Sequence, residues 1–215
     1  MGSSTEPSSA HDEFEQLIAA YAETDSPDKQ TYIQESIWKR FGTTGTTFIS
    51  DMASFSSTSR NLGICHFLKL IHRARATVGP LVKANNGILL KCDADNCYAF
   101  FEQPDDAIRA SMDINAALFD ANERLELEDH IYLSVGIDYG ELLLVGSEDF
   151  YGDPVNTASK LGEDLATKAE TLITERALVR SSYEAHENAE RMVARVSDIE
   201  INYVRITMAE PATND

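Results

Sequence analysis

The sequence predicts an α+β fold in which one β-sheet carries two long helices. Short apolar runs of strand length alternate with longer segments whose apolar residues recur at helical spacing, and turn signals separate them. The order of these segments is β-α-β-β-α-β, which is the split βαβ arrangement. We therefore expect a ferredoxin-like βαββαβ core followed by additional C-terminal αβ elements.

Residues 12–42 are expected to form a helical extension before this core. Residues 1–11 are rich in Ser and are expected to be disordered. A first helix, 12–23, has apolar side chains on one face, and Ser26 before a proline is typical of the start of a second helix, about 28–41. The two helices would pack on the domain, contact another subunit or transmit a signal.

The expected core spans residues 43–208, and its first half contains a long helix and a hairpin. A Gly- and Thr-rich stretch ends the helical pattern, and a strand then runs to Asp51, with a loop expected at 57–60. The helix, the two hairpin strands and their turn are expected at 62–83, 88–92, 97–101 and 93–96.

The second half of the core adds shorter elements. Helices are expected at 104–122, 154–167 and 175–181. Strands are expected at 131–140, 142–145, 171–174, 193–196 and 201–206. Residues 209–215 are expected to be a frayed polar tail.

The composition is that of a globular protein with an acidic surface. The chain has 215 residues, 43% of them hydrophobic, and a formal net charge of −18. This charge argues against broad binding to nucleic acid or to an anionic membrane, because both need basic patches. A nucleotide ligand remains compatible, because bound metal ions invert the local field.

The cysteines and the N-terminus point to a cytoplasmic protein. The three cysteines, Cys65, Cys92 and Cys97, have no repeated spacing and are expected to be reduced small apolar residues. The first residues have neither the basic nor the apolar region of a signal peptide, and no window reaches the length of a membrane span.

Two aspartates stand at the ends of apolar runs that the split arrangement brings side by side. Asp51 ends the first expected strand, and Asp95 lies in the hairpin turn. Two carboxylates at one point repel each other unless a cation lies between them, and Mg²⁺ and Mn²⁺ prefer such oxygen ligands. Both residues also fit ordinary turn or cap positions, so the spacing alone leaves the two interpretations open.

Three ordered stretches resemble the motifs of the class III nucleotidyl cyclase catalytic domain, over roughly residues 43–208. FISDMASF is similar to its first metal motif, with Asp51 in the metal position, and KCDADNCYAFF is similar to its hairpin, with Asp95 as the second metal ligand. YGDPVNTASKL is similar to its downstream motif. Any one stretch alone would be weak evidence, but the three together are specific.

The resemblance implies a reaction and its cofactors. Two divalent cations, Mg²⁺ or Mn²⁺, would activate the ribose 3′-hydroxyl of a nucleoside triphosphate and stabilise the leaving pyrophosphate. By resemblance, Asn156 orients the ribose, while Lys91 and Asp149 read an adenine base, which favours ATP. Lys91 also fits a solvated strand-end lysine, and Asp149 an ordinary acidic loop.

The resemblance also implies a homodimer with two sites at the subunit interface. One subunit would supply Asp51 and Asp95, and the other the base-reading residues with Asn156 and Lys160. Because the chain carries both halves of the site, two identical copies suffice.

The sequence departs from the family pattern at two positions. Ala94 stands where the hairpin has glycine, a change the turn would accept if its φ is negative. Lys160 stands where the family has an arginine that stabilises charge on the reacting phosphate, and lysine keeps the charge but not the bidentate fork.

Three function classes follow from these observations. The first is a cyclase that makes a 3′,5′-cyclic nucleotide for second-messenger signalling, from ATP or, as a pyrimidine cyclase of antiphage signalling, from UTP or CTP. The second is a catalytically impaired, cyclase-like module that binds nucleotide or a partner, which Lys160 and Ala94 favour. The third is a related phosphotransfer domain such as a diguanylate synthase, whose acidic Gly-Gly hairpin is absent here.

Overall fold

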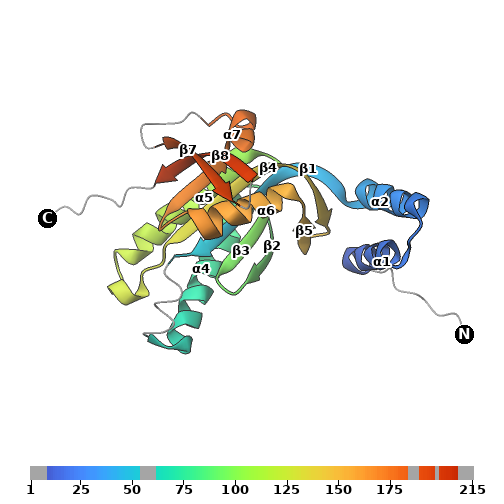
Figure 1. Cartoon of the computed structure of the whole chain (residues 1–215). Coiled ribbons are helices and arrows are strands. Elements are labelled where there is room, and N and C mark those ends of the chain that lie inside the picture. Colours follow the sequence, from blue (N-terminus) through green and yellow to red (C-terminus); the bar gives the residue numbers. More distant parts are fainter. Residues whose placement is uncertain (1–8, 54–61, 184–188, 197–198, 208–215) are drawn as a thin grey trace, which may run out of the picture.

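The computed structural model describes residues 9–53, 62–183, 189–196 and 199–207 and contains one mixed sheet (Figure 1). The strands lie in the order β2-β3-β1-β4-β6-β8-β7, and the short strand β5 pairs only with β4. The first four positions of this order are those of the βαββαβ core, so the expected α+β, ferredoxin-like architecture is confirmed.

The centre of the sheet is formed by β1 (Gly42–Met52), which lies antiparallel between β3 (Asn96–Phe101) and β4 (Leu133–Val145). Its side chains alternate between the two faces, and both Phe48 and Ile49 are fully buried, so both faces are covered at this point. The remaining strands are β2 (Ile88–Asp93), β5 (Asp149–Tyr151), β6 (Glu170–Thr174), β7 (Ala189–Val196) and β8 (Ile199–Thr207).

One face of the sheet is covered by α4 (Ile64–Ala84) and α5 (Pro104–Asn122), with α7 (Glu175–Arg180) beside them. A 3-10 turn, η1 (Leu127–Asp129), follows α5. Their apolar residues form the largest core cluster with the strand residues of that face. The burial of this cluster is the main force that holds the helices on the sheet.

The opposite face carries a helix that approaches the strands very closely. The helix begins as α6 (Asp153–Ser159) and continues as a π-helical turn, η2 (Lys160–Leu165). A Cβ atom on Gly136 of β4 would lie 2.0 Å from the Ala158 carbonyl oxygen, and one on Gly162 would lie 2.8 Å from the Ile49 carbonyl oxygen. Only glycine at these two positions lets the helix lie directly on β1 and β4.

The N-terminal extension is a helical hairpin beside the sheet, formed by α1 (Ala10–Glu23) and α2 (Pro27–Phe41) (Figure 1). It packs against the β4–β5 ribbon through a small core cluster that includes Phe14, Phe41 and Val145. The helices α1 and α2 confirm the two expected N-terminal helices. The first helix begins at Ala10, earlier than expected, because Ser9 forms a capping box with Asp12.

The expected break between two strands near Gly140 is wrong, because β4 runs without interruption from Leu133 to Val145. Gly140 pairs with Gly45 of β1, and a Cβ atom there would lie 2.9 Å from the Pro154 side chain. The glycine therefore permits close packing and does not break the strand. Strand β5 was not expected at all, and β1 begins at Gly42, so it includes the Gly- and Thr-rich stretch.

Some sequence predictions lie outside the described residues, namely the loop at 57–60, the tail at 209–215 and most of the N-terminal segment. All three cysteines are free thiols, with Cys97 buried and Cys65 exposed. Among the described residues, no helix combines the length and the apolar character needed to cross a bilayer.

Candidate active site

The end of β1 and the β2–β3 turn bring Asp51 and Asp95 together. Asp51 is the penultimate residue of β1, and Asp95 lies in the turn that the Asp93–Asn96 pair closes. The charge of Asp95 acts on Asp51, so the two carboxyl groups lie close together. Burial, and next the charge of Asp95, raise the pKa of Asp51 to about 6. The surroundings of Asp51 thus disfavour its charged form.

The β2–β3 turn has an unusual backbone that is held from outside. Ala94 has a φ of 44°, so the condition under which the turn would accept alanine without strain, a negative φ, is not met. A non-glycine residue in the left-handed region costs about 1 kcal/mol. The guanidinium of Arg75, on α4, donates a hydrogen bond of 2.6 Å to the Ala94 carbonyl oxygen, which fixes the turn against the helix. The hairpin therefore presents Asp95 to Asp51 without the usual glycine.

The two carboxylates fit a divalent cation by their chemistry. The pKa of Asp51 is raised by burial and next by the charge of Asp95, and a cation between the two carboxylates would offset this repulsion. Glu163, on η2, adds a further negative charge to the surroundings of Asp51, and its carboxylate accepts a hydrogen bond of 2.8 Å from Ser159. No group of three or more possible metal ligands occurs in the described ranges. Two carboxylates with substrate phosphates are a common Mg²⁺ ligand set.

Lys91 and Asp149 lie together although 58 residues separate them. The Lys91 ammonium, on β2, donates a hydrogen bond of 2.8 Å to the Asp149 carboxylate at the start of β5, and it lies 5.3 Å from the centroid of the Tyr98 ring. The Lys91 side chain is 42% exposed. The pair thus joins the main sheet to the β4–β5 ribbon at a position open to solvent.

Asn156 and Lys160 lie on one side of the helix that crosses β1 and β4. They are four residues apart, and four residues is the spacing that places helical side chains one above the other. Asn156 is exposed. The Lys160 ammonium has no ion-pair or hydrogen-bond partner within the part of the chain that the structure describes. Both side chains are therefore available to a ligand.

A buried carboxylate holds the start of this helix in place. The Arg176 guanidinium, on α7, donates to both oxygens of Asp138, which is fully buried, and donates a hydrogen bond of 2.6 Å to Asp153 at the start of α6. Thr174 donates a further hydrogen bond of 2.5 Å to Asp138. Burial raises the pKa of Asp138 in spite of these partners.

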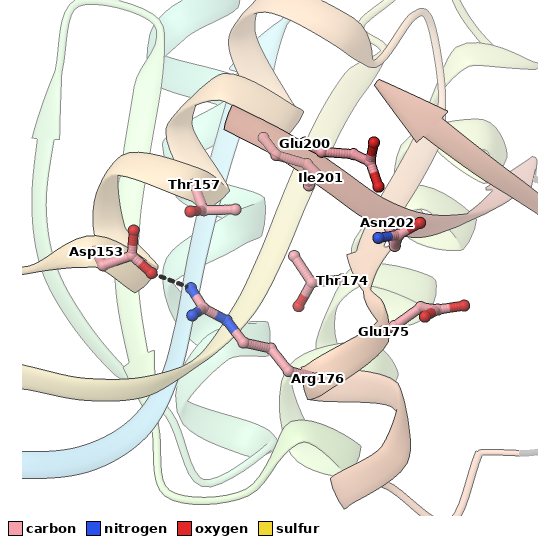
Figure 2. A pocket seen from close by; sticks show the side chains of 8 residues that line it. All are labelled: Asp153, Thr157, Thr174, Glu175, Arg176, Glu200, Ile201 and Asn202. Atoms are coloured by element: carbon pink, nitrogen blue, oxygen red, sulfur yellow. Dashed lines mark hydrogen bonds and ion pairs between the residues drawn. The ribbon is translucent and has the colours of Figure 1, made fainter. Parts of the chain in front are cut away.

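Three members of this network, Asp153, Thr174 and Arg176, line a pocket of about 260 Å³ between α6, α7 and β8, in which Arg176 points toward Asp153 (Figure 2). Sequence reasoning missed the network, because Asp138 and Arg176 lie in no motif. The one available signal was the acidic residue at position 138 inside a mostly apolar strand. The Arg176 guanidinium is paired with two carboxylates and so ties the start of the helix to the sheet.

The candidate residues thus form three groups: Asp51 with Asp95, Lys91 with Asp149, and Asn156 with Lys160. Within the described residues of one chain, no hydrogen bond or ion pair links one group to another. The side chains of the first motif after Ala53 lie outside the described residues.

The fold is shared with solved structures of nucleotidyl cyclases. A bacterial light-regulated adenylyl cyclase is 22% identical with a TM-score of 0.67, and the match covers 80% of this chain and 54% of that one, so the chain spans about half of its length. The guanylyl cyclase Cya2 is 19% identical with a TM-score of 0.65, over 80% and 96% of the two chains.

A third neighbour is the guanylate cyclase domain of RhGC from Catenaria anguillulae, in complex with GTP. It is 14% identical with a TM-score of 0.64, over 76% of this chain and 96% of that one. The chain has the fold of class III nucleotidyl cyclase catalytic domains. At these identities the likeness establishes the cyclase fold, as the three motifs led us to expect. No protein-family model matches the chain, and no curated protein is significantly similar to it in sequence.

Proposed function

We propose that the protein is a metal-dependent nucleotidyl cyclase that converts a nucleoside triphosphate, with ATP favoured, to a 3′,5′-cyclic nucleotide and pyrophosphate. The observation that carries this proposal is the contact between Asp51 and Asp95 at the end of the central strand of a cyclase fold. Among the residues that the structure describes, this carboxylate pair has no basic partner, and the raised pKa of Asp51 marks a site that disfavours its negative charge. The pair becomes favourable when divalent cations and a triphosphate complete it.

Asp51 and Asp95 would hold two divalent cations, Mg²⁺ or Mn²⁺. When bound, these ions supply Lewis-acid activation of the ribose 3′-hydroxyl and stabilise charge on the leaving pyrophosphate. The chain's own contribution is positioning, because the attack is intramolecular. Asn156 would orient the ribose, and the Lys160 ammonium, which has no partner in the described residues, would stabilise charge on the reacting phosphate.

Lys91 and Asp149 would read the base. The lysine is a donor suited to adenine N1, and the carboxylate is an acceptor suited to the 6-amino group. The two side chains now contact each other at 2.8 Å. An ion pair this exposed contributes about 1 kcal/mol or less, so exchanging it for contacts with a base costs little. UTP and CTP remain the alternative substrates, because Lys160 departs from the family pattern.

The complete site would form between two copies of the chain. In this arrangement, the carboxylate pair of one subunit faces Lys91, Asp149, Asn156 and Lys160 of its partner. The absence of direct contacts between the three groups in the described residues of one chain supports this proposal. A C2 dimer contains two such sites.

The test is product formation. The purified protein is incubated with Mn²⁺ and each of ATP, GTP, UTP and CTP, and the products are identified by mass. We expect one cyclic nucleotide to dominate and Asp95→Ala to abolish it. Asp93→Ala is the matched control, because Asp93 is an exposed residue of the same hairpin. A confirmed dimer that forms no cyclic product from any of the four would refute the cyclase proposal and favour the nucleotide-binding module.

A further inference from the structure

The carboxylate of Asp149 lies on β5, a short strand beside the end of β4. β5 has three residues and pairs only with the end of β4. Along β5, Phe150 points to one side and is buried, so Asp149 and Tyr151 share the other side. Phe150 packs into a core cluster with residues of the main sheet, so the ribbon is held on that side. On the other side, the positions of Asp149 and Tyr151 depend on what covers them.

The first N-terminal helix covers the ribbon. The ring of Phe14, on α1, stacks on the ring of Tyr151 with centroids 5.2 Å apart and an interplanar angle of 7°. Phe14 is buried and also meets the edge of Phe41, on α2, at 5.3 Å. At the ribbon's tip, a Cβ atom on Gly146 would lie 3.3 Å from Ala10. The helical hairpin is thus anchored on the ribbon by aromatic contacts.

Tyr151 joins this anchor to the candidate base-reading pair. Its hydroxyl donates a hydrogen bond of 3.2 Å to Asp149 Oδ2, the oxygen that also accepts from Lys91 at 2.8 Å. The other oxygen accepts from the Phe150 backbone at 2.8 Å. Burial, and next the charge of Asp149, raise the pKa of Tyr151, so the hydroxyl keeps its proton at neutral pH.

We propose that the N-terminal helical hairpin positions Asp149 for base recognition, with Tyr151 as the positioning residue and Phe14 as the group that holds Tyr151. The inference rests on the proposed function, because it gives Asp149 the role of reading the base. It deepens that function by making base selectivity depend on helices outside the cyclase core. A carboxylate fixed before binding loses less freedom when the base arrives, which strengthens both affinity and selectivity.

The first test is Tyr151→Phe, which removes only the hydroxyl and keeps the aromatic stack. Two readouts are measured for each of the four bases: kcat and KM for the triphosphates, and equilibrium binding of unreactive 3′-deoxy triphosphates. One hydrogen bond to a charged group predicts a rise of about 10-fold in the KM and Kd of the preferred nucleotide, with little change in kcat and reduced selectivity. Tyr32→Phe is the matched control, because Tyr32 is an exposed tyrosine of α2.

A double-mutant cycle shows whether Tyr151 acts through Asp149. If it does, Tyr151→Phe has no further effect on selectivity in a chain that already carries Asp149→Ala. Phe14→Leu, which removes the stack while keeping an apolar side chain, is expected to act in the same direction as Tyr151→Phe. Thermal unfolding of each variant shows whether the fold is intact. A change in selectivity in a folded variant can then be attributed to a displaced Asp149 carboxylate.

The outcomes separate the inference from the proposed activity. Unchanged selectivity in Tyr151→Phe, or a full effect of this change in the Asp149→Ala background, would overturn the inference. A wild-type protein that binds the 3′-deoxy nucleotides selectively, loses that selectivity in Tyr151→Phe and forms no cyclic product would refute the activity and uphold the positioning role. A wild-type protein that binds no nucleotide would overturn both.

Discussion

The two ends of the candidate site have opposite electrostatics. At one end, burial and next the charge of Asp95 raise the pKa of Asp51 to about 6. At the other, Lys91 and Asp149 satisfy each other at 2.8 Å. In the proposed site, a cation completes the first pair, and a base takes the place of the ion pair in the second. We therefore expect the Asp51–Asp95 pair to lower the stability of the ligand-free protein, and the Lys91–Asp149 pair to change it very little.

The largest effect is expected when one charge is removed from the Asp51–Asp95 pair, the metal end of the candidate site. Asp95→Asn is expected to lower cyclase activity about 100- to 1,000-fold, the scale for losing one preorganised charged group. The same change should raise the free energy of unfolding of the metal-free protein by up to about 1 kcal/mol, because it removes the repulsion on a half-exposed carboxylate. Steady-state kinetics and urea unfolding measure the two effects. A variant with reduced stability would show that the repulsion between Asp51 and Asp95 does not destabilise the metal-free protein.

The buried ion pair below the helix provides a second comparison. Arg176→Ala leaves Asp138 fully buried without its main partner and should lower the free energy of unfolding by about 3 kcal/mol. Lys91→Ala should change it by at most about 1 kcal/mol, because that pair is exposed. Urea unfolding of both variants at one pH tests the contrast. Equal losses would mean that the Lys91–Asp149 pair is far less open to solvent than the structure shows.

At the base end, the expected effect is on selectivity. Lys91→Ala and Asp149→Ala should each reduce the ratio of kcat/KM between the preferred nucleotide and the others about 10-fold, the scale of one charged hydrogen bond. The Mn²⁺ concentration dependence should stay the same, since neither side chain lies at the carboxylate pair. A shift in metal dependence without a shift in base preference would reverse the assignment of the two ends.

The raised pKa of Asp51 predicts that both stability and Mn²⁺ binding depend on pH. The pKa of Asp51 is raised from 3.8 to about 6, so between these values the folded protein binds more protons than the unfolded chain. The contribution of Asp51 to the stability of the metal-free protein is therefore largest below pH 4 and is lost as the pH rises to about 6. Mn²⁺ binding should weaken below pH 6, because the ion then competes with a proton. Calorimetric titration at pH 5 and pH 7 tests this, and equal affinities would contradict it.

The smallest expected effect concerns the turn between the two ends. Ala94→Gly should raise the free energy of unfolding by up to about 1 kcal/mol, because glycine adopts a positive φ without strain. Ala99→Gly is a suitable contrast, because Ala99 is a buried strand residue of the same hairpin and glycine there is expected to destabilise. A loss of stability in Ala94→Gly would mean that the Arg75 clamp already compensates for the strain.

Most core elements could be predicted from the sequence, because a local pattern of apolar spacing or a turn signal marks each of them. The hairpin around Asp95 was predicted from strand periodicity and a polar turn, and the contact of Asp51 with Asp95 was expected from the strand order. The sign of φ at Ala94 was not predictable, because the Arg75 clamp comes from a distant helix. Gly140 was misread as a break, since its function depends on Pro154 across the sheet. The proposed role of Tyr151 could not be predicted, because it depends on the position of α1, which no local sequence pattern determines.

The close approach at Gly136 and Gly162 has a mechanical consequence. Because backbone lies against backbone there, sliding of the helix that carries Asn156 and Lys160 over β1 would bring backbone atoms into collision. We therefore expect this helix and the strand that ends at Asp51 to move together. In the proposed dimer, we expect the site to open by rotation of one subunit against the other.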